Sequence, residues 1–222
     1  MSLAGRVASH KPQPILIREG GFGGADGLAV YITTHQFTHV VDATHPFAAK
    51  MSENAIAACR ISGVPLVALT RAPWTEVSGD HWTHVPDIAA AAANLGGERR
   101  RVLLAIGRMH LDQFFDTQQH FYLLRLVDEP PQPLPFRDHH TLIARGPFDL
   151  AADIALLRDH EIDLVVSKNA GGTGAYAKIE AARSLGIDVV MIQRPKITDR
   201  PERHSVTAVL NWLKGHETDL GV

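Results

Sequence analysis

Short apolar runs rich in Val, Ile and Leu alternate with longer stretches of helical period along most of this chain. The runs that we interpret as β-strands are PILIR, HVVDA, VPLVALT, RVLLAIG, FYLLRL, TLIARG, DLVVSK and DVVMIQR. Between them we expect helices near residues 25–36, 47–62, 88–94, 111–115, 150–160, 176–185 and 205–214. Nearly continuous apolar strands separated by helices are typical of parallel sheets that are covered on both faces. The pattern therefore predicts an α/β fold with mainly parallel sheets.

One polar, glycine-containing break divides this pattern. The segment NLGGERRR, residues 94–101, is followed by a fresh series of strands and helices. Boundaries between domains fall in exposed polar segments of this kind. We therefore expect two lobes, residues 1–97 and 98–222.

Composition and charge exclude several classes of protein. The 222 residues carry a formal net charge of −2 and no sustained basic run, so we expect neither a nucleic-acid partner nor a membrane partner. Cys59 is the single cysteine, which excludes an internal disulfide and favours a reducing, cytoplasmic location. The opening residues lack the apolar core of a signal peptide, and no run of 18 apolar residues occurs. We expect a cytoplasmic monomer.

The histidine pairs in HWTH (81–84) and HQFTH (35–39) have spacings seen in metal sites. Neither pair has a carboxylate partner on a clear helix face, so we expect no metal site. A serine hydrolase is also disfavoured, because no G-x-S-x-G elbow is present.

Polar residues follow the predicted strand HVV at Asp42, Ala43, Thr44, His45 and Pro46. Ligands of open parallel sheets bind outside the carboxyl ends of the strands. Pro46 suits the first turn of a following helix, whose free N–H groups attract phosphate or ribose oxygens. The alternative is that Asp42 or Thr44 only caps the helix and His45 is a surface imidazole.

A second polar strand end is SKNAGGTGAYAK, which follows DLVV. Lys168 supplies a charge and Asn169 an amide, while Gly171 and Gly172 let the backbone approach a ligand. The stretch is not a Walker loop, because its lysine precedes the glycines. A tight strand-to-helix turn, with Lys178 simply solvated, is the alternative.

Three arginines stand near strand ends in the predicted fold. Arg6 lies just past the tail of a strand, where an arginine can bind a ribose 2′-phosphate. Arg108 and Arg194 leave two later strands, and such arginines suit a polycarboxylate or phosphorylated ligand. Taken singly, each arginine is equally explained as a surface residue.

Four stretches together, SLAGR, VVDATHPFA (40–48), LLAIGR (103–108) and SKNAGGTGAYAKIEAARSLGIDVVMIQRP (167–195), resemble the precorrin-6A reductase family of cobalamin biosynthesis. The resemblance covers nearly the whole chain, and the pairing of DATHPFA with the later Lys-Asn-Gly-Gly stretch is its most specific part. It implies two Rossmann-like lobes with a cleft between them and NADPH as hydride donor. It also implies a tetrapyrrole-derived polycarboxylate, precorrin-6A, in which one macrocycle double bond is reduced to give precorrin-6B.

The resemblance also implies roles for individual residues. Arg6 would bind the 2′-phosphate of NADPH, and Asp42, Ala43, Thr44, His45 and Pro46 would face the nicotinamide half. The substrate would be lined by Arg108, Lys168, Asn169, Gly171, Gly172, Thr173, Lys178 and Arg194. His45 and Lys178 are the candidate catalytic proton donors, with water as the alternative.

Members of that family usually begin with a strand, a Gly-Gly-Thr-type turn and a helix before the segment matching SLAGR. We expect that element to be absent from this chain. Two other functions therefore stay open: a non-catalytic tetrapyrrole-binding pathway protein that lost cofactor binding, and an unrelated two-lobed transferase that uses residues 167–178 for phosphate.

Overall fold

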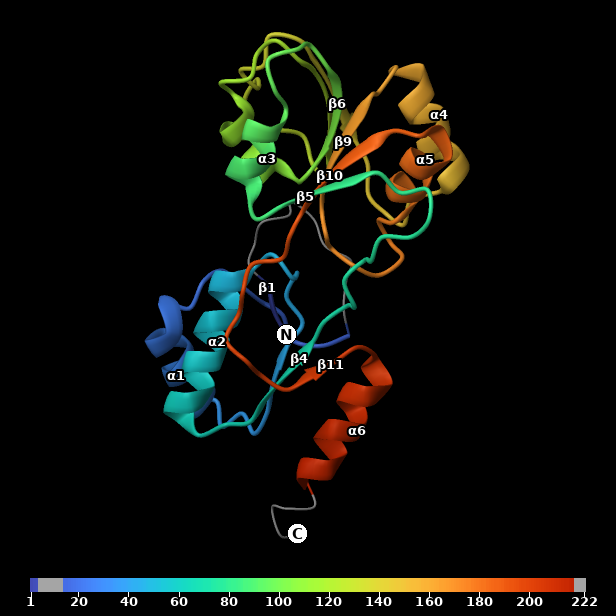
Figure 1. The fold of residues 1–222 in the computed structure, drawn as a ribbon. Helices are drawn as coiled ribbons and strands as arrows, with labels where there is room; N and C mark the ends of the chain where they lie inside the picture. The colour runs from blue at the N-terminus through green and yellow to red at the C-terminus, as the bar shows by residue number, and fades with distance from the viewer. Residues whose placement is uncertain (4–13, 218–222) are drawn as a thin grey trace. The chain divides into compact units, whose positions relative to one another are not determined.

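The chain forms two compact units in its computed structural model, which describes residues 1–3 and 14–217 (Figure 1). One unit comprises Met1–Ala72 and Pro195–Val222, and the other comprises Pro73–Arg194. The expected boundary at residue 97 differs from this division, because the strand Trp82–Val85 pairs with a strand near residue 190. The carboxyl-terminal segment also returns to the first unit, which no local pattern indicates.

The first unit contains two short parallel sheets. The pair β1–β2 is separate from a three-stranded sheet of order β11-β4-β3. Its elements are β1 (Ser2–Leu3), β2 (Arg18–Glu19), α1 (Gly24–Thr34), β3 (Val40–Asp42), α2 (Ala49–Ser62), β4 (Leu66–Leu69), β11 (Glu202–Arg203) and α6 (Val206–Glu217). Figure 1 shows α1 and α2 side by side, with α6 on the other side of β4 and β11.

Helices α1 and α2 form most of the apolar core of this unit. Their facing sides bury small and branched side chains, and Leu66 of β4 joins them; the buried set is Leu28, Ala29, Ile32, Ala55, Ile56, Ala58, Cys59 and Leu66. Helix α2 ends at Gly63, whose φ of 70° is a conformation that glycine adopts without steric cost. The core thus fixes the carboxyl end of β3 beside the start of α2.

The second unit is built on one six-stranded parallel sheet of order β5-β10-β9-β6-β7-β8. Its strands are β5 (Trp82–Val85), β6 (Arg101–Ala105), β7 (Phe121–Leu126), β8 (His139–Ile143), β9 (Leu164–Lys168) and β10 (Asp188–Ile192). Strands β6, β7, β9 and β10 are almost wholly buried, which agrees with their continuous apolar sequences.

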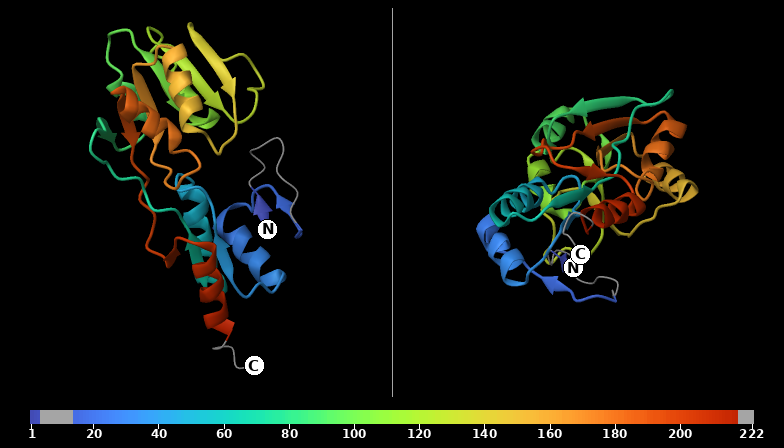
Figure 2. Two further views of the ribbon diagram at one scale, coloured as in Figure 1. Left: turned by 90° about the vertical axis from the view of Figure 1, so that its right-hand side faces the viewer. Right: turned by 90° about the horizontal axis from the view of Figure 1, so that it is seen from below.

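Helices α4 (Leu150–Asp159) and α5 (Ala177–Leu185) pack together on one face of this sheet, and α3 (Ile88–Asn94) lies on the other (Figures 1 and 2). Two of these helices begin at aspartates that accept a hydrogen bond from an amide three residues on, Asp87 for α3 and Asp149 for α4. Leu103, Val165 and Met191 of the central strands pack against the α4–α5 layer and its neighbours. The parallel sheets confirm the predicted α/β class.

Several expected elements have other bounds in the structure. The expected helix at 111–115 is part of a kinked 3-10 segment, η1 (Arg108–Phe114), and only the last residue of PILIR enters a strand. Sequence reasoning missed β5 and β11, whose residues are not dominated by apolar side chains. Within residues 1–3 and 14–217, no helix combines the length and apolar character needed to span a bilayer.

Candidate functional site

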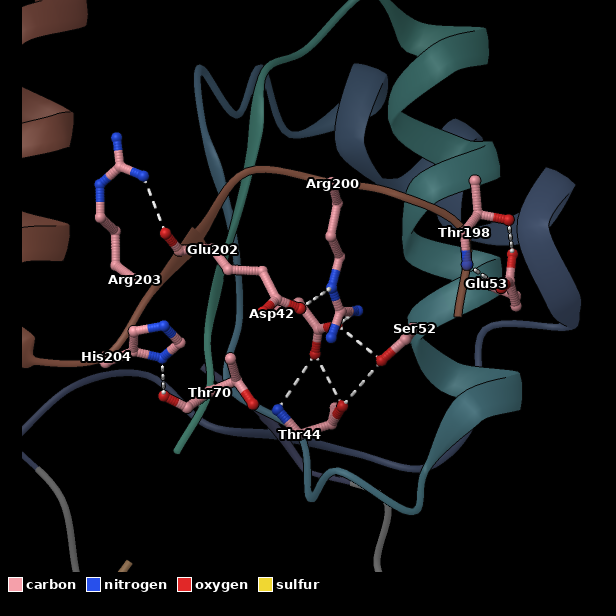
Figure 3. Close-up of polar contacts among 10 residues, drawn as sticks. All are labelled: Asp42, Thr44, Ser52, Glu53, Thr70, Thr198, Arg200, Glu202, Arg203 and His204. Atoms are coloured by element: carbon pink, nitrogen blue, oxygen red, sulfur yellow. Dashed lines mark hydrogen bonds and ion pairs between the residues drawn. The ribbon is translucent and has the colours of Figure 1, made fainter. Parts of the chain in front are cut away.

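The carboxylate of Asp42, at the end of β3, is buried and bonded on both oxygens (Figure 3). Oδ1 accepts hydrogen bonds from the amide and the hydroxyl of Thr44, at 3.0 and 2.7 Å. Oδ2 accepts one from Ser52 Oγ of α2 at 2.7 Å and pairs with the Arg200 guanidinium at 2.5 Å. Four donors therefore bind the two oxygens of Asp42. This carboxylate orders the turn after β3 and connects it to Arg200, which lies in the carboxyl-terminal segment that returns to this unit.

The returning segment 198–203 has further attachments in the same unit (Figure 3). The amide and hydroxyl of Thr198 donate to the Glu53 carboxylate at 2.7 and 2.9 Å. These two hydrogen bonds hold the pKa of Glu53 below its ordinary value, with smaller contributions from nearby arginines. Arg200 Nε also lies 3.6 Å from Glu202. The segment is therefore fixed against α2 and the end of β3 by charged and polar side chains.

The remainder of the turn exposes Ala43, Thr44 and His45, while Pro46 is buried. The ring nitrogen Nδ1 of His45 accepts a hydrogen bond from the amide of Phe47 at 3.2 Å. Pro46 precedes the first residue of α2 by three positions, so it lies outside the helix that it was expected to start. No side chain in the described part of the chain caps the beginning of α2. Exposed groups and uncapped amides therefore meet at the carboxyl end of β3.

Arg6, the residue expected to contact a 2′-phosphate, lies outside the described residues.

In the second unit, the chain changes direction in the sheet between β6 and β9. From β6 it proceeds outward to β7 and β8, and from β9 it proceeds the opposite way to β10. In open α/β sheets, ligands bind outside the carboxyl ends of two such neighbouring strands. Here those ends carry Arg108 after β6, and Lys168 with the glycine-rich stretch after β9. Two of the predicted substrate-binding segments thus lie at one edge of the sheet.

Lys168 links these two strand ends directly. Its ammonium donates a hydrogen bond to the backbone oxygen of Ile106 at 2.7 Å. Burial lowers its pKa from 10.5 to about 8, because the charged form loses hydration. Arg108 is exposed, and its guanidinium has no hydrogen-bond or ion-pair partner among the described residues. The two side chains therefore differ: one cation is held in the protein and the other is available to a ligand.

We call residues 169–175, between β9 and α5, the glycine loop. The side chain of its first residue, Asn169, is bonded to another part of the protein. Its buried amide accepts from the backbone nitrogen of Trp74 at 2.7 Å and donates to the backbone oxygen of Trp74 at 2.9 Å. The guanidinium of Arg194 donates to the loop oxygens of Asn169 at 2.9 Å and Ala170 at 3.2 Å. The structure thus gives Asn169 and Arg194 contacts that hold the loop, although both were predicted to line the substrate.

Lys178 is 3% exposed, on the first turn of α5. Its Nζ donates to the Ala175 oxygen at 2.6 Å and lies 4.9 Å from the centre of the Trp74 ring. A buried ion pair between Arg125 and Asp153, at 2.6 Å, is close enough to influence it. Burial, with a smaller effect of Arg125 opposed by Asp153, lowers the pKa of Lys178 from 10.5 to about 7. The amine is enclosed by protein, so the expected direct proton transfer from it has no geometric support.

The exposed part of the glycine loop is formed by Thr173 and Gly174. Gly171 and Gly172 both have φ of 69°, a conformation that residues with a Cβ rarely adopt. This backbone is compatible with both interpretations of the stretch, a close approach to a ligand and a tight strand-to-helix turn.

Two important residues were missed in the sequence. Arg200 pairs with Asp42 across 158 residues, and Trp74 contacts Asn169 across 95 residues. The sequences around them, TDRPE and RAPWTE, contain no recognised motif. No group of three His, Cys, Asp or Glu side chains suited to a metal ion occurs in the described part of the chain.

Comparison with known proteins gives a consistent result. The family described as "Precorrin-6x reductase CbiJ/CobK" matches residues 1–214. The chain is 54% identical over 215 residues to a protein named precorrin-6A reductase from Rhodobacter capsulatus, covering 97% of this chain and 86% of the relative. It is 31% identical over 182 residues to a cobalt-precorrin-6A reductase from Priestia megaterium, covering 78% of this chain and 71% of that protein. A solved structure titled "CobK precorrin-6A reductase" superimposes with a TM-score of 0.93 at 53% identity, covering 97% of this chain and 86% of that one.

Proposed function

Because this chain belongs to the precorrin-6x reductase family, we propose that it reduces precorrin-6A at one carbon–carbon double bond of the macrocycle, with NADPH as hydride donor. The product is precorrin-6B, and the reaction belongs to cobalamin biosynthesis. The single observation that carries this proposal is the high identity to named precorrin-6A reductases along nearly the whole chain. The choice of precorrin-6A over its cobalt-containing form follows the relatives of higher identity.

The residues after β3 fit a dinucleotide. The uncapped amides at the start of α2 and the exposed groups of Thr44 and His45 are donors and acceptors suited to phosphate and ribose oxygens. Asp42 would act through the turn that it orders, since its oxygens are already bonded within the protein. NADPH supplies a hydride when bound there. These residues would hold the turn in one conformation. A fixed turn would hold the nicotinamide in an orientation suited to hydride transfer and so reduce the entropic cost of the reaction.

The residues at the β6–β9 edge fit a polycarboxylate. Arg108 offers a charged donor, and the glycine loop that follows Lys168 offers backbone amides. These groups would bind acidic side chains of the macrocycle and so orient the double bond. A proton must also reach the carbon next to the one that accepts hydride. His45 is the candidate donor among the residues after β3, and water is the alternative.

The direct test is to mix the purified chain with precorrin-6A and NADPH and follow loss of nicotinamide absorbance together with a product two mass units heavier. NADH serves as the comparison, and saturable fluorescence titration of NADPH measures cofactor binding alone. Turnover with NADPH preferred is expected. Binding of precorrin-6A without NADPH binding or turnover would overturn the reductase proposal and favour a non-catalytic tetrapyrrole-binding protein.

The role of Arg108 is tested separately by Arg108→Ala. Removal of a cation that contacts a substrate carboxylate raises KM for precorrin-6A by about tenfold, with kcat little changed. Arg137→Ala is the matched control, because Arg137 is also exposed but precedes β8 and so lies at the opposite, amino-terminal edge of the sheet. If the two variants have the same KM for precorrin-6A, Arg108 does not bind the substrate.

A further inference from the structure

Most backbone carbonyl groups of the glycine loop are hydrogen-bonded within the described residues, whereas most of its backbone amides are not. Five of its carbonyl oxygens accept hydrogen bonds from side chains or from another loop. The donors are Arg194 Nε to Asn169 (2.9 Å), Arg194 Nη2 to Ala170 (3.2 Å), Trp74 Nε1 to Gly172 (2.7 Å), the Phe148 amide to Gly174 (3.3 Å) and Lys178 Nζ to Ala175 (2.6 Å). By contrast, the amides of residues 171–175 donate to no acceptor in the described part of the chain.

This asymmetry has a consequence for the direction of the amides. In a trans peptide, the carbonyl of one residue and the amide of the next point in opposite directions within one plane. A donor that holds the Gly172 carbonyl therefore also sets the direction of the Thr173 amide. Glycine at 171 and 172 would otherwise let these peptide planes rotate at little cost. The orientation of the loop is thus imposed by its donors.

Trp74, one of these donors, is itself held in place by several contacts. Both of its backbone groups are bonded to the Asn169 side chain, and its ring lies 5.5 Å from that of Tyr176. Farther along the same segment, Asp80 forms an ion pair with Arg183 of α5 at 2.8 Å, and Arg183 also donates to Tyr176 at 2.6 Å. The indole N–H, which donates a hydrogen bond to the Gly172 oxygen, therefore belongs to a side chain whose position is fixed by its neighbours.

We propose that Trp74 is a positioning residue for the reduction: its indole N–H holds the Gly172 carbonyl so that the amides of 171–175 are directed to a carboxylate of the substrate. The inference rests on the proposed function, which makes this loop part of the substrate site. Trp74 acts through the loop and does not itself touch the reacting atoms. Arg194 has the same role at the carbonyls of Asn169 and Ala170.

The test is Trp74→Phe, which keeps an aromatic ring in the core but removes the indole donor and part of the ring; the control carries the same change of ring size. The control is Trp82→Phe, because Trp82 packs against the same core cluster and its buried Nε1 has no hydrogen-bond partner among the described residues. For Trp74→Phe we expect KM for precorrin-6A to rise about tenfold, while kcat and the KM for NADPH stay near their original values. For Trp82→Phe we expect all three constants unchanged. Equal precorrin-6A KM in the two variants would overturn the positioning role.

A second measurement separates this inference from the proposed function. In 15N spectra without any ligand, the Thr173 amide of Trp74→Phe is expected to shift or broaden, because its peptide plane is released, whereas Trp82→Phe leaves it unchanged. An unperturbed Thr173 amide in Trp74→Phe would overturn the inference even if the chain reduced no precorrin-6A. If Trp74→Phe fails to fold, Arg194→Lys replaces it, with the same expected rise in KM and with the Ala170 and Gly171 amides as the reporters.

Discussion

Replacing Lys178 by methionine tests whether one buried amine makes the stability of the second unit depend on pH. Methionine has a similar length and no charge, so it fills the same space. The pKa of Lys178 is about 7 in the folded protein against 10.5 for a free lysine, chiefly because of burial. Between these two values the unfolded chain binds more protons at this side chain than the folded chain does. Folding stability therefore rises with pH in this window, and the gain is absent from Lys178→Met.

The magnitude follows from the difference in proton binding. A full proton of difference changes the unfolding free energy by about 1.4 kcal/mol per pH unit. Lys178 is half protonated near pH 7 in the folded state and largely neutral two units higher, while the unfolded lysine stays protonated. Integrated between about pH 7 and pH 9, the wild type gains about 2 kcal/mol relative to Lys178→Met. Lys168 is present in both proteins, so its own contribution cancels.

Urea unfolding at several pH values measures this difference. Trp74 and Trp82 belong to the same unit as Lys178, so tryptophan fluorescence in a Trp212→Phe background reports on that unit. Lys50→Met, at an exposed lysine of α2, controls for the loss of one positive charge. If the unfolding free energies of wild type and Lys178→Met run parallel from pH 7 to pH 9, the buried amine does not titrate as inferred.

Three further predictions concern packing and burial. Arg200→Met leaves the Asp42 carboxylate buried without its cation, so urea unfolding of the first unit is expected to show a loss of about 3 kcal/mol, and an unchanged midpoint would contradict the assignment of this pair. Gly146→Ala places a Cβ 2.8 Å from a carbonyl oxygen of the glycine loop, so thermal unfolding should show a loss of about 1–3 kcal/mol in unfolding free energy. Gly97→Ala is the control, because open space surrounds its Cβ, and it should change the unfolding free energy little. Burial raises the pKa of the Cys59 thiol to about 11, so a disulfide reagent at mildly alkaline pH is expected to modify it only after denaturation; rapid labelling of the native protein would refute this.

Local features of the chain were sufficient to predict the fold class and to locate two strands that end in polar residues. The runs VVDA and DLVVSK are strands that end in polar residues, as their composition indicates, and glycine is required where the loop after β9 takes positive φ. Periodicity and turn chemistry are properties of residues that are neighbours in the sequence, so they can be recognised without the tertiary structure. The family was likewise recognisable from motifs that are contiguous in the sequence.

The use of each polar side chain was decided by partners that are distant in the sequence. Asp42 was predicted to face a cofactor, yet its oxygens are occupied by Arg200 and by donors from its own turn and α2. Asn169 was predicted to face the substrate, yet it holds Trp74. A buried carboxylate or amide must be matched by hydrogen-bond partners, and which donor reaches it depends on how strands and connections are arranged in space.

The sequence by itself therefore determined the fold class, the polar ends of β3 and β9, and the family to which the chain belongs. Only the tertiary structure decided that β5 joins the second sheet, that the carboxyl-terminal segment returns to the first unit, and that Lys178 is enclosed by protein. The physical reason is that burial and pairing are settled by the whole chain at once: a side chain offers the same atoms in any sequence context, but its neighbours fix whether those atoms bind a ligand or the protein itself.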